Sequence, residues 1–95
     1  MNTAQLLTAL KIDLGIRTTA YDDRLTDRLT EAQTALTEMG IVLEDTVSDR
    51  DLVIMYAAWL WRDRVTGAPM PRMLVMARNN KLFGQKARTE TEAGT

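Results

Sequence analysis

Ten consecutive apolar residues, LVIMYAAWLW from Leu52 to Trp61, limit the folds open to this chain of 95 residues. A helix through them is apolar on every side, so other elements must surround it. The run cannot span a bilayer, which needs roughly 20 apolar residues. Ser48 and Asp51 resemble a capping box, and Gly67 supplies a stop, which predicts a helix from about 49 to 66.

Two tryptophans of this predicted helix point in different directions. Trp59 and Trp61 lie about 200° apart around a helix axis, so they cannot both face the same neighbour. We expect one indole to meet the core of the chain itself and the other to be covered by a partner subunit.

A stripe with helical spacing marks the clearest helix of the chain. Its apolar members step by four, three, four and three positions: Leu25, Leu29, Ala32, Leu36 and Met39. Asp22 favours the positive end of the helix dipole, and Gly40 lies where a helix of this length ends. A shorter helix is predicted before it, with Thr3 as N-cap, an end near Asp13 and Gly15 as its stop.

Residues 41–47 (IVLEDTV) form the one β-like stretch. A single short strand would have no partner, so we interpret this stretch as an extended loop whose Ile41 and Leu43 lean onto the core. The predicted fold class is therefore all-α, a small bundle of about four helices with an extended loop between the second and third.

The fourth helix is predicted from Pro71 to about Leu82. Proline suits the first position of a helix and, with Pro69, prevents the third helix from continuing. Helical spacing predicts a packed side that consists of Met73, Leu74, Ala77 and Phe83. From Gly84 onward the chain is polar and has no periodicity, which predicts a helical domain over residues 1–83 and a mobile tail over 84–95.

The composition argues against an enzyme. The chain has no cysteine and no histidine, which removes disulfides, thiolate sites and the commonest general base and zinc ligand. Ser48 is the only serine, so no Ser-His-Asp triad can form. The two acidic pairs, 22–23 and 44–45, are interpreted as helix N-terminal charge and loop solubility. We expect no catalysis, no cofactor, no metal site and no membrane segment, and the N-terminus lacks the pattern of a signal peptide.

Charge is distributed unevenly along the chain. Residues 1–61 carry a net charge of −5, residues 62–88 carry +6, and the whole chain carries −1. This asymmetry predicts two contact surfaces of opposite charge, or else reflects chance segregation on a solvated surface. Close-set Met70, Met73 and Met76 would add an adaptable apolar contact patch. The candidate partner-binding residues are Met70, Arg72, Met73, Arg78, Lys81, Lys86 and Arg88.

The order of the segments resembles a known family. LLTALKIDLGI, YDDRLTDRLTEAQTALTEMGIVL, DLVIMYAAWLWRDR and MPRMLVMARNNKLF, between Leu6 and Phe83, are similar to the small head–tail connector proteins of long-tailed bacteriophages, also called head-completion or adaptor proteins. The landmarks are Tyr21–Asp22, Gly40–Ile41, Tyr56–Ala57 and Arg78–Asn79–Asn80.

The resemblance implies a structural virion protein at the head–tail interface, assembled in the host cytoplasm. It would form a ring of its own copies under the portal protein, following the portal's twelvefold symmetry, with the tail-completion (stopper) protein on the other side. Packaged DNA would pass through the channel without sequence-specific recognition. Two alternatives stay open: a small helical DNA-binding regulator that uses the same basic residues, and a helical interaction module of another complex, such as a toxin partner.

Overall fold

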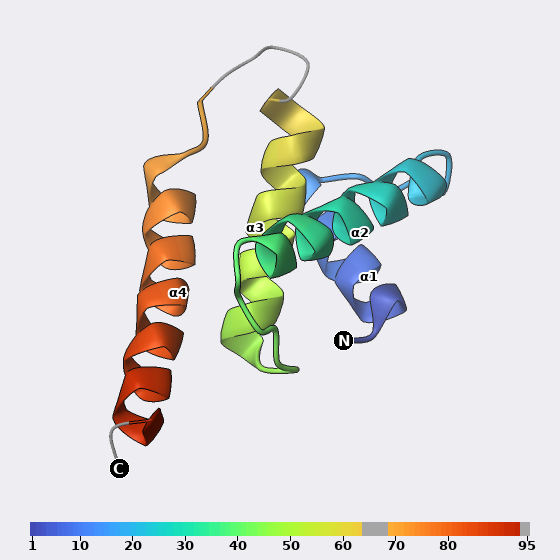
Figure 1. Cartoon of the computed structure of the whole chain (residues 1–95). Coiled ribbons are helices and arrows are strands. Elements are labelled where there is room, and N and C mark those ends of the chain that lie inside the picture. Colours follow the sequence, from blue (N-terminus) through green and yellow to red (C-terminus); the bar gives the residue numbers. More distant parts are fainter. Residues whose placement is uncertain (64–68, 94–95) are drawn as a thin grey trace.

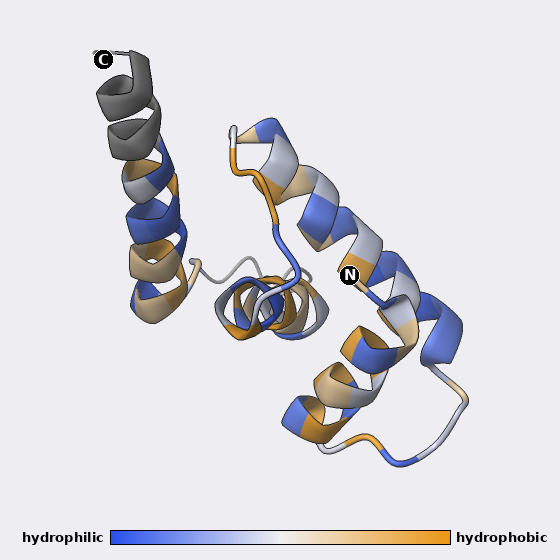
Figure 2. Cartoon of the chain, turned by 90° about the horizontal axis from the view of Figure 1, so that it is seen from below, coloured by the Kyte–Doolittle hydropathy of each residue, from blue (hydrophilic) through white to orange (hydrophobic). Residues whose placement is uncertain are grey.

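Helix α3 lies at the centre of the molecule, and the other helices pack around it (Figure 1). The computed structural model describes the backbone of residues 1–63 and 69–93, and the side chains of residues 1–62 and 69–85. These residues form four helices and no strand, which confirms the all-α prediction; the helices are α1 (Thr3–Leu14), α2 (Asp22–Glu38), α3 (Val47–Asp63) and α4 (Arg72–Ala93). Viewed along α3, α4 lies on one side and the α1–α2 pair on the other (Figure 2).

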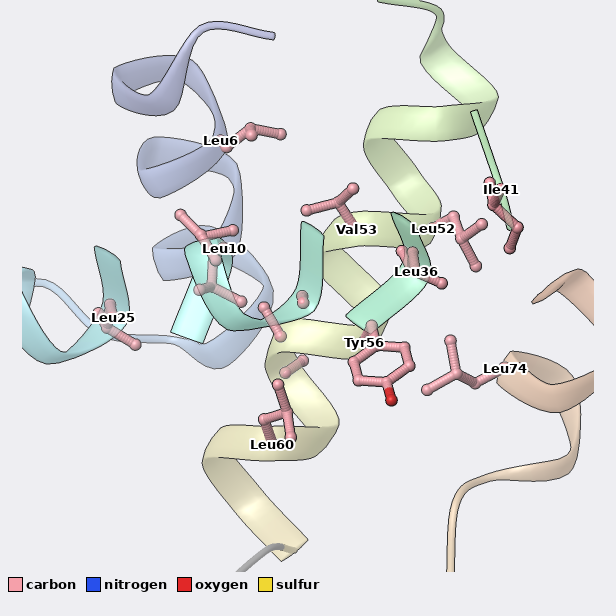
Figure 3. Packing of buried hydrophobic residues seen from close by; sticks show 14 residues of the cluster. Leu6, Leu10, Leu25, Leu36, Ile41, Leu52, Val53, Tyr56, Leu60 and Leu74 are labelled. Atoms are coloured by element: carbon pink, nitrogen blue, oxygen red, sulfur yellow. The ribbon is translucent and has the colours of Figure 1, made fainter. Parts of the chain in front are cut away.

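The core is built where α1 and α2 meet α3. Four members of the predicted stripe are buried in α2, Leu25, Leu29, Ala32 and Leu36, whereas Met39 at the C-cap is half-buried. Leu6 and Leu10 of α1 complete the layer opposite α3 (Figure 3). Around α3 the buried side chains lie on several sides, as an all-apolar helix requires; they are Leu52, Val53, Tyr56, Ala57, Ala58 and Leu60.

Both tryptophans of α3 are half-buried against this core. Trp61 makes an edge-to-face contact with Tyr21 at 5.6 Å between ring centroids, and Trp59 makes one with Tyr56 at 5.7 Å. Each indole therefore has an aromatic neighbour within its own chain.

Two helix caps differ from the predicted ones. The side-chain oxygen of Asn2, rather than Thr3, caps α1 by accepting from the backbone N–H groups of Ala4 and Gln5 at 2.9 and 3.2 Å. Helix α3 begins at Val47 rather than near residue 49, because the hydroxyl of Thr46 accepts from the N–H of Asp49 at 3.2 Å. Both corrections move the cap to the nearest upstream residue whose side chain reaches the free N–H groups of the first turn.

The predicted stops after α1 and α2 are confirmed. Gly15 has φ of 72° and Gly40 has φ of 98°, a left-handed conformation that glycine adopts without the steric cost of a Cβ. Between α2 and α3 the chain is extended, with Ile41 buried and Leu43 packed against the core, as expected for the loop. The predicted end of the third helix, Thr66 with Gly67, lies outside the described residues.

Helix α4 extends to Ala93, so its predicted end near Leu82 was wrong. Gly84 costs a helix interior only about 1 kcal/mol relative to alanine. The residues after it include good helix formers and no proline, so the helix continues through a segment that has no apolar periodicity. The boundary predicted at residue 83 therefore falls inside one helix, while the mobility of residues 84–95 stays a prediction.

Replacement of Leu29 by alanine should destabilise the fold strongly. Its side chain is fully buried in the α2 stripe, and a Leu→Ala cavity costs about 2–5 kcal/mol. Urea unfolding followed by circular dichroism measures the change. Met73→Ala, at an exposed position of α4, is the control and should change the free energy of unfolding by less than about 0.5 kcal/mol. Equal losses in the two variants would contradict this description of the core.

Candidate interaction surface on helices α3 and α4

Helix α4 has little apolar contact with the rest of the chain. Leu74 is the one buried residue among its described side chains, with 2% of its surface exposed. It faces Tyr56 of α3 in the core (Figure 3). Ala77 and Leu82 are half-buried against the same core, and polar groups supply further contacts that hold the orientation of this 22-residue helix.

The first polar contact centres on Asp49, in the first turn of α3. Its side chain is 1% exposed, and one carboxylate oxygen lies 3.1 Å from the Nζ of Lys81 on α4. The other oxygen accepts a 2.7 Å hydrogen bond from the N–H of Glu44 in the loop. A buried carboxylate is tolerated when it is paired and hydrogen-bonded, and both oxygens of Asp49 are satisfied here.

The second polar contact lies one helical turn further along α4. The side-chain amide of Gln85 accepts from the N–H of Val42 at 3.0 Å and donates to the carbonyl oxygen of the same residue at 2.7 Å. The glutamine thereby pairs with both backbone groups of an extended residue, as a neighbouring strand would. Lys81 and Gln85 are four positions apart and define the inner side of α4.

This inner side differs from the predicted packed side. Leu74 is buried and Ala77 is half-buried, as predicted, but Met73 and Phe83 are 76% and 64% exposed. That prediction used only the helical spacing of the apolar residues to identify the packed side. The ion pair of Lys81 instead turns Met73 and Phe83 toward solvent.

The predicted partner-binding residues of the described region have different environments. Arg72 and Met73 are exposed at the start of α4. Met70 packs against the core, and its sulfur lies 3.7 Å from a guanidinium nitrogen of the half-buried Arg78. Lys81 is held by Asp49 within the chain. Of these five residues, only Arg72 and Met73 are therefore exposed to a partner.

The other two predicted residues, Lys86 and Arg88, belong to α4 by their backbone. Their side chains lie outside the described residues.

The outer face of α4 exposes apolar side chains to solvent. We use this name for Arg72, Met76, Asn80 and Phe83, which are all exposed and which follow one another at helical spacing. Met76 is 51% exposed, so with Phe83 it gives the face two large apolar groups. Exposed apolar groups gathered on one helix face are typical of a protein interface.

Beside this face, a groove runs between α3 and α4. It consists of two hollows of about 230 and about 180 Å³, and Met55 lines both. We call it the α3–α4 groove; its α3 side includes Asp51, Met55, Trp59 and Arg62, and its α4 side includes Met73, Leu74, Ala77 and Lys81.

Polar and charged groups lie along the apolar lining of the groove. The indole N–H of Trp59 is buried and has no hydrogen-bond partner within the described part of the chain. The guanidinium of Arg62 donates to the carbonyl oxygen of Asp13 at 3.2 Å, which holds Arg62 at one end of the groove. Asp51 is exposed at the other end. Asp13 also lines the Arg62 end, and the paired Asp49 and Lys81 also line the Asp51 end.

Local sequence patterns did not predict that Asp49 and Gln85 make the contacts that hold α4. Thr46 and Asp49 also have the spacing of a capping box, two positions upstream of Ser48 and Asp51. For Gln85 no local signal exists, because its partner Val42 is 43 positions away in the chain.

Among the described side chains, those of residues 1–62 and 69–85, no group of three acidic, histidine or cysteine residues is arranged to hold a metal ion. None of the helices searched in that region is long and apolar enough to cross a membrane. Comparison with known proteins found no matching family model, no matching curated protein and no matching solved structure.

Replacement of Lys81 by alanine should cost about 3 kcal/mol of folding stability, because it leaves the buried carboxylate of Asp49 without its counter-charge. Urea unfolding measures this loss, and Arg72→Ala, an exposed cation of the same helix, is the matched control. A second variant, Asp49→Asn with Lys81→Met, removes both charges and should recover part of the loss, since no uncompensated charge stays buried. If Lys81→Ala and Arg72→Ala were equally mild, the ion pair would not hold α4.

Proposed function

We propose that the protein is a structural subunit that assembles into a ring adaptor at the head–tail junction of a long-tailed phage. The ring sits between the portal protein and the tail-completion (stopper) protein and extends the DNA channel. The protein acts by contact alone, without catalysis or a cofactor, and its place is the virion after assembly in the host cytoplasm.

The observation that carries this proposal is the outer face of α4. It presents Met76 and Phe83 to solvent with Arg72 at its start, on a helix that projects beside the core rather than closing it. A monomer gains nothing from two large exposed apolar groups on one helix face, whereas an assembly buries them. The family resemblance of the sequence, from Leu6 to Phe83, supplies the identity of the assembly.

No observation favours the alternative of a DNA-binding regulator. A regulator would need its basic residues free to contact phosphates. Lys81 is paired with a buried carboxylate, and Arg78 is half-buried against Met70. Two of the basic side chains on which this alternative relies are therefore engaged within the chain.

Electron microscopy of the protein mixed with portal rings encoded by the same genome tests the proposal. We expect an added ring of density below the portal. The variant M76S/F83S should fold with an unchanged helical circular-dichroism signal and lose this density, because it removes the apolar groups of the outer face. The matched control is Ile12→Ser, which removes an exposed apolar group of α1 and should keep the density.

A portal without added density would contradict the adaptor function. So would a gel shift with duplex DNA that persists at about 150 mM salt with a steep salt dependence, since that behaviour belongs to a phosphate-binding protein.

A further inference from the structure

We infer that the outer face of α4 of one copy lies in the α3–α4 groove of the next copy, with this α4 parallel to the α3 of that next copy. The inference deepens the proposed function and rests on it, because it names the contact by which the subunits of the ring are joined. Helix-in-groove docking is a common mode of recognition, and it needs an amphipathic helix and an apolar groove of matching length. This chain carries both.

The two surfaces have the same spacing. The outer face places Arg72, Met76, Asn80 and Phe83 at steps of four, four and three positions. On α3, the groove residues follow the same steps of four, four and three: Asp51, Met55, Trp59 and Arg62. Because parallel α-helices rise by the same 1.5 Å per residue, one row can lie beside the other over its whole length of roughly 16 Å.

At the two ends of this register, the pairs are electrostatically favourable. Arg72 meets the exposed carboxylate of Asp51, and the ring of Phe83 meets the guanidinium of Arg62, a cation–π pair. In the antiparallel orientation, Arg72 would instead approach Arg62, and Phe83 would approach Asp51. Asp13 also lines the Arg62 end of the groove, so the preference for the parallel orientation rests on the Arg72–Asp51 pair.

In the middle of the register, Met76 lies over Met55, which joins the two hollows of the groove. Methionine side chains adapt their shape to such a contact. Asn80 lies over the half-buried indole of Trp59, which lines the groove.

The second copy is the occupant that this geometry favours, because α4 belongs to both surfaces. Its Met73 and Ala77 line the groove of its own chain, while Met76 and Phe83 face outward. Each copy therefore offers one groove and one helix to different neighbours. Such a heterologous contact repeats from copy to copy and closes into a ring when the rotation allows it.

Site-directed cross-linking of the free protein at high concentration tests the contact. The chain contains no cysteine, so introduced thiols are the only ones present. We expect a mixture of Arg72→Cys and Asp51→Cys chains to be joined by a short thiol cross-linker at least about tenfold more than the control mixture of Arg72→Cys and Thr34→Cys, whose exposed Thr34 lies on α2.

Two results would overturn the inference. One is cross-linking of the Asp51→Cys mixture at the control level, and the other is stronger joining of Arg72→Cys chains to themselves, which indicates a symmetric contact. Either result, together with a ring still visible below the portal, rejects the groove contact and keeps the adaptor function. The expected cross-link without any density on the portal keeps the contact and rejects the adaptor function.

A charge exchange tests the register independently. Arg72→Asp and Asp51→Arg should each weaken self-association by about tenfold in sedimentation velocity, because each places like charges at one end of the contact. The double variant R72D/D51R restores the opposite-charge pair between neighbours, so its association should return to within about threefold of the unchanged protein. Thermal unfolding of each variant checks that the monomer stays folded. A double variant as weak as the sum of the single ones would overturn the register.

Discussion

The buried carboxylate of Asp49 is the contact on which the position of α4 depends. A charge at 1% exposure is costly unless both of its oxygens find partners, and the chain supplies them from two distant segments. Glu44 binds one oxygen through its backbone, and Lys81 binds the other through its ammonium group. One residue in the first turn of α3 thus joins the extended loop and the last helix, and it sets which side of α4 faces inward.

This contact separates the molecule into two parts that are held by different forces. Helices α1, α2 and α3 share an apolar core that consists mainly of leucines and alanines. Helix α4 adds Leu74 to that core, packs Ala77 and Leu82 against it, and is further attached through the polar groups of Lys81 and Gln85. A helix attached in this way leaves its apolar side chains available to another molecule.

The functional proposal follows from this division of roles. A protein that works by assembly must keep large side chains exposed in the monomer and still fold, and polar attachment of α4 meets both demands. Met76 and Phe83 stay outside because Lys81 and Gln85 occupy the inner side. The same helix lines the groove with Met73 and Ala77, so a subunit can present complementary surfaces to two neighbours without any change in its own fold.

The sequence by itself determined the helices whose signals are local. The apolar run from Leu52 to Trp61 required a central helix, the stripe from Leu25 to Leu36 specified the buried side of α2, and Gly15 and Gly40 marked two helix ends. These features depend on residues a few positions apart, so periodicity and backbone conformation are enough to predict them.

Only the tertiary structure decided the orientation of α4 and the surface that it presents. The inner side of α4 depends on Asp49 and Val42, which lie more than thirty positions from Lys81 and Gln85 in the chain. No spacing rule relates such residues, and the apolar pattern alone placed Met73 and Phe83 on the wrong side. The groove arises in the same way, since its two walls come from separate helices whose relative position is set by that long-range ion pair.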